Sequence, residues 1–220
     1  KGFIDLVRNR SVTANAGATR LPNLVGNVTI PRQSAAATAY WLLTEATAIT
    51  ESQQTFGQLA LTPKNVGAYT EISRQLLLQS DPGADAIVMT DLAAQVALAV
   101  DLAAINGSGA SGQPTGILNT AGIGAFTGTS LAYAGLLNAQ GDVIGANGLV
   151  NPASAGYVTT PAVAELLMAR QRFTSTDSPL WEGAMLDGKV AGNRALACSN
   201  MPAATMIFGV AHIIAYLSRF

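Results

Sequence analysis

Segment 84–105 constrains the fold more than any other part of the sequence, because nothing in it interrupts a helix. Asp81 supplies a helix N-cap, and Pro82 suits the first turn. About 22 helical residues at 1.5 Å each make a rod roughly 33 Å long. The only polar side chains in its C-terminal two thirds are Asp91, Gln95 and Asp101. Because such a helix is apolar all round, we expect it to be buried on more than one side.

The chain is poor in charge. Only 11% of its residues are charged, against about 25% in ordinary soluble domains, and the net charge is −1. So few charges exclude a basic field for sequence-specific nucleic-acid binding. They also leave a surface that a membrane or other protein chains must cover. The charge-free runs 102–141 and 195–218 are interrupted by polar residues, so we predict no membrane-spanning helix and expect burial against protein.

A long two-armed β-hairpin is predicted ahead of the helix, over residues 28–72. Extended patterns occupy 28–30, 39–49, 59–61 and 66–72, the first stopped by Pro31, and the polar segment 50–57 forms the tip. Pro63 makes the returning arm an edge strand, because proline cannot donate a ladder hydrogen bond. A two-stranded hairpin is marginal alone in water, so we expect a neighbouring subunit to support it.

Gly107, Gly109 and Gly112 spell G-x-G-x-x-G, the pattern of a dinucleotide-binding loop. That loop must follow a strand and open a helix, so that free N–H groups point at a pyrophosphate. Here the glycines follow the long helix and lead into Gln113-Pro114. The sequence therefore predicts a turn and not a phosphate site.

The second half of the chain alternates helix and strand patterns without an internal repeat, which indicates an α/β or α+β arrangement. We expect helices at 131–144 and 161–172, strands at 157–160, 190–198 and 206–208, a loop at 178–188, and strand or helix at 210–217.

The residues that usually carry chemistry are few. His212, the only histidine, lies in an apolar run, and Cys198, the only cysteine, is expected to be a small buried residue. One histidine excludes a multi-histidine metal site. The carboxylates form no pair by spacing, and Trp41 and Trp181 are expected to be packing anchors. We therefore predict no catalytic residue, metal ligand or cofactor site, and no enzyme.

Five short motifs carry a resemblance to a known family: ISRQLL at 72–77, NG at 106–107, QPTGIL at 113–118, SNMP at 199–202 and IFG at 207–209. In this order and at these distances they resemble the major capsid proteins of tailed bacteriophages, which share the Hong Kong 97-type capsid fold. The resemblance covers about residues 28–210. One departure is Val210, where the family has an acidic or polar residue.

The resemblance implies an α+β fold with four parts. These are an N-terminal arm (1–27), an extended loop formed by the hairpin (28–73), a peripheral domain (74–119) with a spine helix at 82–106, and an α/β axial domain (120–220). The glycine turn would be the crossing from the spine helix to the axial domain. The family chain continues with strands that return to the peripheral domain, and we expect these strands to be missing from residues 1–220.

The implied function is that of a structural subunit of an icosahedral viral capsid, which self-assembles into hexamers and pentamers around the DNA genome. The implied partners are other copies of the chain, the portal, scaffold, protease and cement proteins of a phage, and packaged DNA in non-specific contact, with no membrane. The virion capsid is the expected location, with the host cytoplasm before assembly. The alternatives are an encapsulin-type compartment shell and a nucleotide-binding enzyme. The candidate intersubunit contacts are Tyr40, Trp41, Phe56, Leu59 and Leu61.

Overall fold

The computed structural model describes residues 12–13, 15–21, 26–42, 44, 48, 50–75, 84–126, 128, 130–148, 154–175, 177–210 and 214–216. The chain divides into two compact units. One comprises Lys1–Arg20 and Lys64–Ala215 and contains the long helix and a five-stranded sheet. The other comprises Leu21–Pro63 with Tyr216–Phe220 and contains the hairpin. His212, the short amphipathic start of the chain and the predicted N-cap at Asp81 lie outside the described residues.

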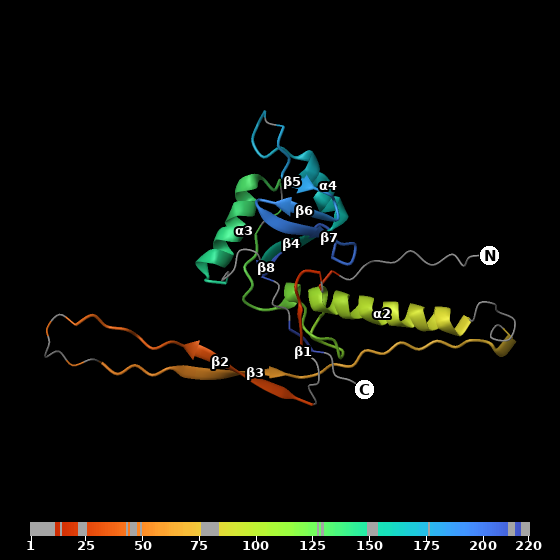
Figure 1. The fold of residues 1–220 in the computed structure, drawn as a ribbon, viewed down its shortest axis with the longest axis horizontal. Coiled ribbons are helices and arrows are strands. Elements are labelled where there is room, and N and C mark those ends of the chain that lie inside the picture. Colours follow the sequence, from red (N-terminus) through yellow and green to blue (C-terminus); the bar gives the residue numbers. More distant parts are fainter. Residues whose placement is uncertain are drawn as a thin grey trace. The chain divides into compact units, whose positions relative to one another are not determined.

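Figure 1 labels most of the helices and strands. In chain order they are β1 (Thr19–Leu21), β2 (Val28–Ala35), β3 (Thr55–Leu61), α2 (Ala84–Asn106), the 3-10 helix η1 (Ile117–Asn119), α3 (Tyr133–Gly145), β4 (Ala155–Thr159), α4 (Pro161–Ala169), β5 (Trp181–Gly183), β6 (Asp187–Val190), β7 (Asn193–Ala197), β8 (Met206–Val210) and β9 (Ile214–Tyr216). β1 pairs with β9 in a sheet of two strands.

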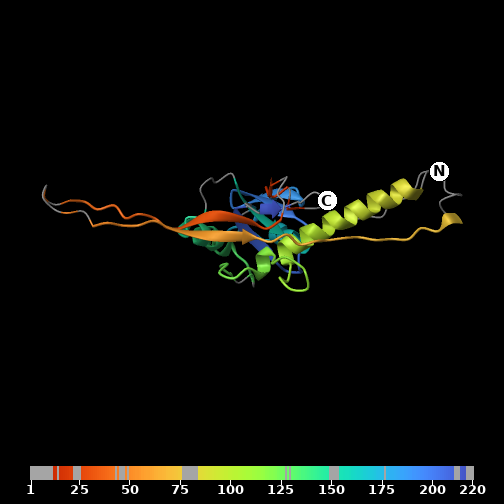
Figure 2. The same cartoon turned by 90° about the horizontal axis from the view of Figure 1, so that it is seen from below.

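The predicted hairpin is confirmed, although its boundaries differ from the prediction. β2 and β3 pair antiparallel and run side by side in Figures 1 and 2. Pro31 does not stop β2, because it lies within the strand opposite Gln58. Each strand of a two-stranded sheet has a free edge, where a residue without an N–H is tolerated. The predicted tip at 50–57 is also wrong, since β3 already begins at Thr55. The described residues of 39–49 and 66–72 form no strand.

The long helix is confirmed as α2, but its expected burial is not present within one chain. Only Asp101 and Ile105, both near its C-terminal end, are buried among the described side chains of the helix. Met89 is 69% exposed. Residues Asp85–Asn106 are long and apolar enough to cross a bilayer, since an 18-residue window within them reaches a mean hydropathy of 1.7. Length and composition alone do not place a helix in a membrane, so the absence of a membrane-spanning helix, which was inferred from the runs 102–141 and 195–218, stays a prediction.

The five-stranded sheet has the order β5-β6-β7-β4-β8. β4 runs parallel to β7, and the other neighbours are antiparallel. The predicted helices are confirmed as α3 and α4, and the predicted strands as β4, β7 and β8. The expected loop at 178–188 is wrong, because this segment contains β5 and the start of β6. Gly188 permits that pairing, since a Cβ there would lie 2.4 Å from Nε1 of Trp181.

The main core lies on one face of this sheet. Its largest fully buried side chains are Leu136, Tyr157, Leu167, Leu180, Trp181 and Val190. α3 contacts β8, and α4 contacts β5. The Tyr157 hydroxyl donates to the Leu136 carbonyl oxygen at 3.0 Å, and Trp181 Nε1 donates to the Ala184 carbonyl oxygen at 2.9 Å. Both polar aromatic groups are thus satisfied inside the core, and Trp181 is the packing anchor that the sequence predicted.

Candidate functional site

The five predicted contact residues lie in or near the hairpin, and the structure gathers only two of them. Side chains alternate between the faces of a strand, so Leu59 and Leu61 share one face, and Phe56 lies on the other. Tyr40 and Trp41 lie beyond the end of β2. Trp41 is fully exposed, so its prediction as a packing anchor is wrong within one chain.

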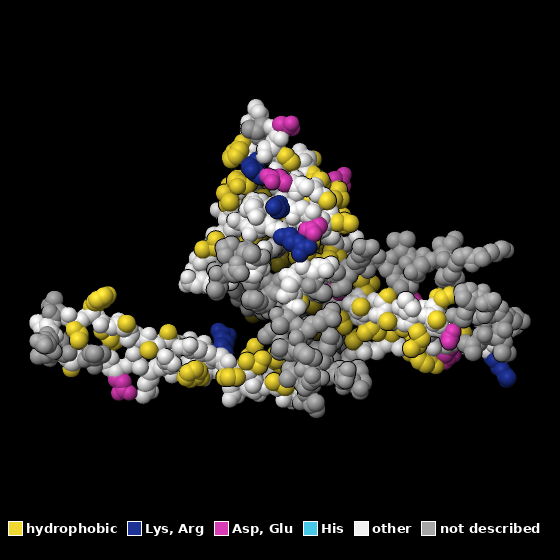
Figure 3. Space-filling model, viewed as in Figure 1, with side chains coloured by type: hydrophobic (Ala, Val, Ile, Leu, Met, Phe, Trp, Pro, Cys, Tyr) yellow, Lys and Arg dark blue, Asp and Glu magenta, His cyan; other side chains and the backbone are white. Residues whose placement is uncertain are grey.

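The face that carries Leu59 and Leu61 is apolar. Their cross-strand partners are Ile30 and Val28, respectively, so four aliphatic side chains lie together. Leu59 is 44% exposed, and the other three are half-buried. Phe56, on the opposite face, is 68% exposed. Apolar surface of this kind on both faces of a hairpin indicates an interaction site. Figure 3 shows hydrophobic side chains along both the hairpin and α2, with few charges among them.

The glycine-rich segment after α2 is a closed turn, as predicted. The Gly107 N–H donates to the Ala103 carbonyl oxygen at 2.9 Å, and the Gly109 N–H donates to the Pro114 carbonyl oxygen at 3.2 Å. The Gly116 N–H donates to the Gly107 carbonyl oxygen at 2.8 Å. These N–H groups are engaged within the protein. They therefore cannot serve as the free donors that a bound phosphate needs.

The glycines of this turn are required by close backbone approach. A Cβ at Gly107 would lie 2.2 Å from the Pro114 carbonyl oxygen, and a Cβ at Gly116 would lie 2.4 Å from the Gly107 nitrogen. Gly109 has a φ of 73° and Gly112 a φ of 80°, in the left-handed region that favours glycine. The G-x-G-x-x-G pattern is therefore explained by the backbone conformation of a turn.

A buried carboxylate joins three distant segments of the first unit. Asp101 of α2 is 1% exposed. One oxygen, Oδ1, accepts from the N–H groups of Val12 and Thr13 at 3.1 and 2.9 Å and from the Thr13 hydroxyl at 2.6 Å. The other, Oδ2, accepts from Asn200 Nδ2 at 3.0 Å. In the sequence, Asp101 is only one of the few polar side chains in an apolar helix. Its acidic side chain in that apolar setting was the one available sign that it joins separate segments.

Two titratable groups near this junction are shifted by their surroundings. Burial alone would raise the pKa of Asp101, but the hydrogen bonds from Thr13, Asn200 and Val12 outweigh it, so the pKa lies below its ordinary value. Burial raises the pKa of the Cys198 thiol, and the Asp101 charge adds to that rise. Cys198 is therefore the small buried residue that the sequence predicted, and its raised pKa disfavours the reactive thiolate.

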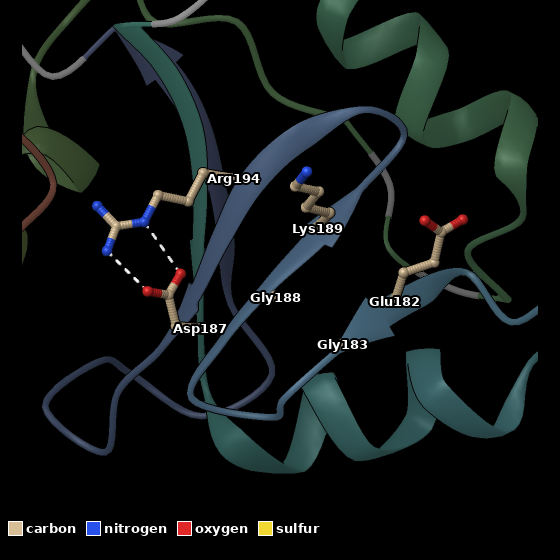
Figure 4. A pocket seen from close by; sticks show the side chains of 6 residues that line it. All are labelled: Glu182, Gly183, Asp187, Gly188, Lys189 and Arg194. Carbon is tan, nitrogen blue, oxygen red and sulfur yellow. Dashed lines mark hydrogen bonds and ion pairs between the residues drawn. The ribbon is translucent and has the colours of Figure 1, made fainter.

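An open hollow of about 490 Å³ lies over β5, β6 and β7 (Figure 4). Arg194 binds the Asp187 carboxylate through two nitrogens, at 3.0 and 2.8 Å, and Figure 4 shows the Lys189 side chain between this pair and Glu182. Glu182 forms an ion pair with Arg172. The opposite charges pair with each other, and the residues that the structure describes hold no group of three metal-ligating side chains. The hollow is therefore a charged surface that contains the Arg194–Asp187 ion pair.

An uncovered apolar hairpin, a long exposed apolar helix and a compact mixed sheet are the features of a protein built to pack against other copies. Their combination is the Hong Kong 97-type capsid fold, found in structural proteins of the virion capsid. The chain belongs to the phage capsid family, whose model matches residues 1–217. It is 29% identical over 210 residues to the major capsid protein of Halomonas phage phiHAP-1, which covers 94% of this chain. The chain spans about a third (33%) of that relative's length.

Solved structures confirm the predicted fold class. The capsid of a native GTA particle matches 96% of this chain and 77% of its own, with a TM-score of 0.75 and 19% identity. Gordonia phage Cozz matches with a TM-score of 0.62 at 17% identity, over 96% of this chain and 71% of its own. Mycobacterium phage Che8 matches with a TM-score of 0.64 at 15% identity, over 99% and 80%. These comparisons do not favour an encapsulin-type shell or a nucleotide-binding enzyme.

Proposed function

We propose that this chain forms the shell of an icosahedral phage capsid and encloses the DNA genome. The observation that carries the proposal is the apolar surface of the hairpin, where Trp41 is fully exposed and Phe56 is 68% exposed. Exposed aromatic side chains in such numbers cost solubility unless a partner covers them. In a shell, the neighbouring copy supplies that cover.

The division into parts follows the same proposal. Residues 1–27 serve as the N-terminal arm, 28–73 as the extended loop, 74–119 as the peripheral domain and 120–220 as the axial domain. Tyr40, Trp41, Phe56, Leu59 and Leu61 are the intersubunit contacts. The partners are further copies of the chain in hexamers and pentamers, the portal, scaffold, protease and cement proteins, and packaged DNA. The shell needs no cofactor and performs no catalysis. Its subunits are located in the host cytoplasm before assembly.

Electron microscopy of the full-length protein tests this function. Closed shells, or flat hexamers and pentamers, are expected from the unaltered protein. Replacing Trp41 and Phe56 together with serine removes two exposed aromatic groups of the hairpin, and assembly should fail while the sheet remains folded. Gln58→Ser, on the same face as Phe56, is the matched control and should assemble normally. A protein that stays monomeric at tens of micromolar, or a double variant that assembles normally, would contradict the proposal.

The content of the particles separates a capsid from a compartment. Particles from infected or induced cells should contain DNA that survives nuclease treatment of the intact shell. A packaged enzyme in place of DNA would instead support an encapsulin-type compartment shell.

A further inference from the structure

The N-terminal segment 12–18 crosses the face of the sheet that α3 and α4 leave uncovered. Tyr157 and Ala195 face the main core, so their neighbours Val158 and Leu196 face the other way. There Val12 packs against Leu196 and Cys198, forming a second, smaller core. The segment therefore covers an apolar strip, defined here as Val158, Leu196 and Cys198.

The segment is folded on itself and attached to the sheet at few points. The Ala16 N–H donates to the Val12 carbonyl oxygen at 2.8 Å, and the Ala18 N–H donates to the Thr13 carbonyl oxygen at 3.1 Å, which makes a compact turn. Arg194 donates to the Asn15 carbonyl oxygen at 3.1 Å. Among the described residues of 12–18, no β-ladder links the segment to the five-stranded sheet.

Asp101 supplies the principal polar attachment. Its carboxylate accepts from both Val12 and Thr13, through two backbone N–H groups and one hydroxyl. Hydrogen bonds to a charged, buried acceptor are about twice as strong as neutral ones. The same carboxylate holds Asn200, so it ties the segment both to α2 and to the loop after β7. The hydrogen bonds of the segment to α2 therefore depend on one side chain, whereas a strand in a sheet is held by hydrogen bonds to many backbone groups.

We propose that segment 12–18 is a detachable strap, clamped by Asp101 over the apolar strip, which can leave the sheet without unfolding it. The main core supports the sheet from the opposite face, so loss of the strap removes only the smaller core. When the strap is closed, it holds the N-terminal arm to the rest of the unit, and when it opens, it releases the arm. This inference depends on contacts within one chain and does not require the proposed shell.

Cys198 reports on the strap directly. It is the only cysteine in the chain, and it is 5% exposed beneath Val12. A thiol reagent such as 5,5′-dithiobis(2-nitrobenzoate) reacts with it only when the strap opens. Asp101→Asn keeps the shape of the side chain but removes the charge, and labelling should accelerate about 10- to 100-fold through loss of the charge-assisted bonds. Val12→Ala loosens the apolar side of the strap and leaves the carboxylate intact, so it should also accelerate labelling. Asp142→Asn, an exposed change of the same kind on α3, should leave the rate unaltered.

Hydrogen exchange of the unaltered chain keeps the proposal testable if Asp101→Asn does not fold. With denaturant raised from zero, the amides of Val12, Thr13, Ala16 and Ala18 should open together well before those of β4 and β7. The proposal is overturned if folded Asp101→Asn and Val12→Ala both label Cys198 at the unaltered rate. It is also overturned if the strap amides exchange only with global unfolding, because the strap would then be an inseparable part of the sheet.

Discussion

The side-chain amide of Asn200 donates a hydrogen bond of 3.0 Å to the carboxylate of Asp101, 99 residues earlier in the chain. Both side chains are buried, and the same amide also reaches the Leu98 carbonyl oxygen at 3.4 Å. Asn200 follows β7, and Asp101 belongs to α2. This pair therefore joins the long helix to the sheet inside the first unit.

Asn200→Ala should lower the free energy of unfolding by about 1–3 kcal/mol, because the buried Asp101 carboxylate loses a donor that no water replaces easily. Urea denaturation followed by circular dichroism measures the change. Asn138→Ala, on the exposed side of α3, is the matched control and should stay within about 0.5 kcal/mol of the unaltered chain. Equal effects of the two substitutions would show that the Asn200 bond does not stabilise the fold.

The pH dependence of stability should also depend on Asp101. Its pKa in the folded chain lies below the ordinary value of 3.8, so its contribution is present above that value and is lost as the pH falls through the folded pKa. The free energy of unfolding, measured from pH 6 down to pH 2, should therefore fall less steeply for Asp101→Asn than for the unaltered chain. Parallel curves would contradict this.

For the pH dependence that Asp101 contributes to stability, the exposed carboxylate of Asp187 is the control. Arg194 lowers its pKa through a direct hydrogen bond, but the pair lies in solvent, where such pairs contribute little. Asp187→Asn should therefore alter the acid limb of the stability curve much less than Asp101→Asn.

Gly107→Ala should destabilise the first unit by about 1–3 kcal/mol, the usual cost of forcing atoms into a packed site. The new Cβ would lie 2.2 Å from one backbone oxygen, of Pro114, and 2.5 Å from another, of Ala103. Gly124→Ala is the control, because nothing lies within 4 Å of a Cβ there and its φ is ordinary. Thermal unfolding of both variants separates steric crowding from a general effect of losing a glycine. A neutral Gly107→Ala would show that the turn can relax.

Amide exchange of the unassembled chain should find residues 39–61 weakly protected beside β4. The hairpin has two strands and apolar surface on both faces, whereas β4 lies between two neighbouring strands in a covered sheet. Assembly should then raise the protection of 39–61. Equal protection in the unassembled chain would mean that the hairpin needs no partner.

Local sequence patterns predicted most elements and missed those that depend on contacts. α2 was predictable because helix-favouring residues follow one another without interruption, and the turn at Gly107 because an Asn-Gly pair ends a helix. β5 and β6 were missed because they are short and rich in glycine, and their pairing depends on Gly188 lying against Trp181. Trp41 was expected to pack, but it is fully exposed in a single chain, where no side chain of the described residues covers it.

The sequence by itself determined the long helix, the hairpin, the glycine turn and, through its spaced motifs, the capsid fold. Helix and strand propensity, the periodicity of apolar residues and the spacing of motifs are all local properties of the sequence. Only the tertiary structure decided what Asp101 does, because its partners Val12 and Asn200 lie 89 and 99 residues away. No local pattern connects such positions. An acid inside an apolar helix becomes a clamp only when the fold brings its donors to it and excludes water from all of them.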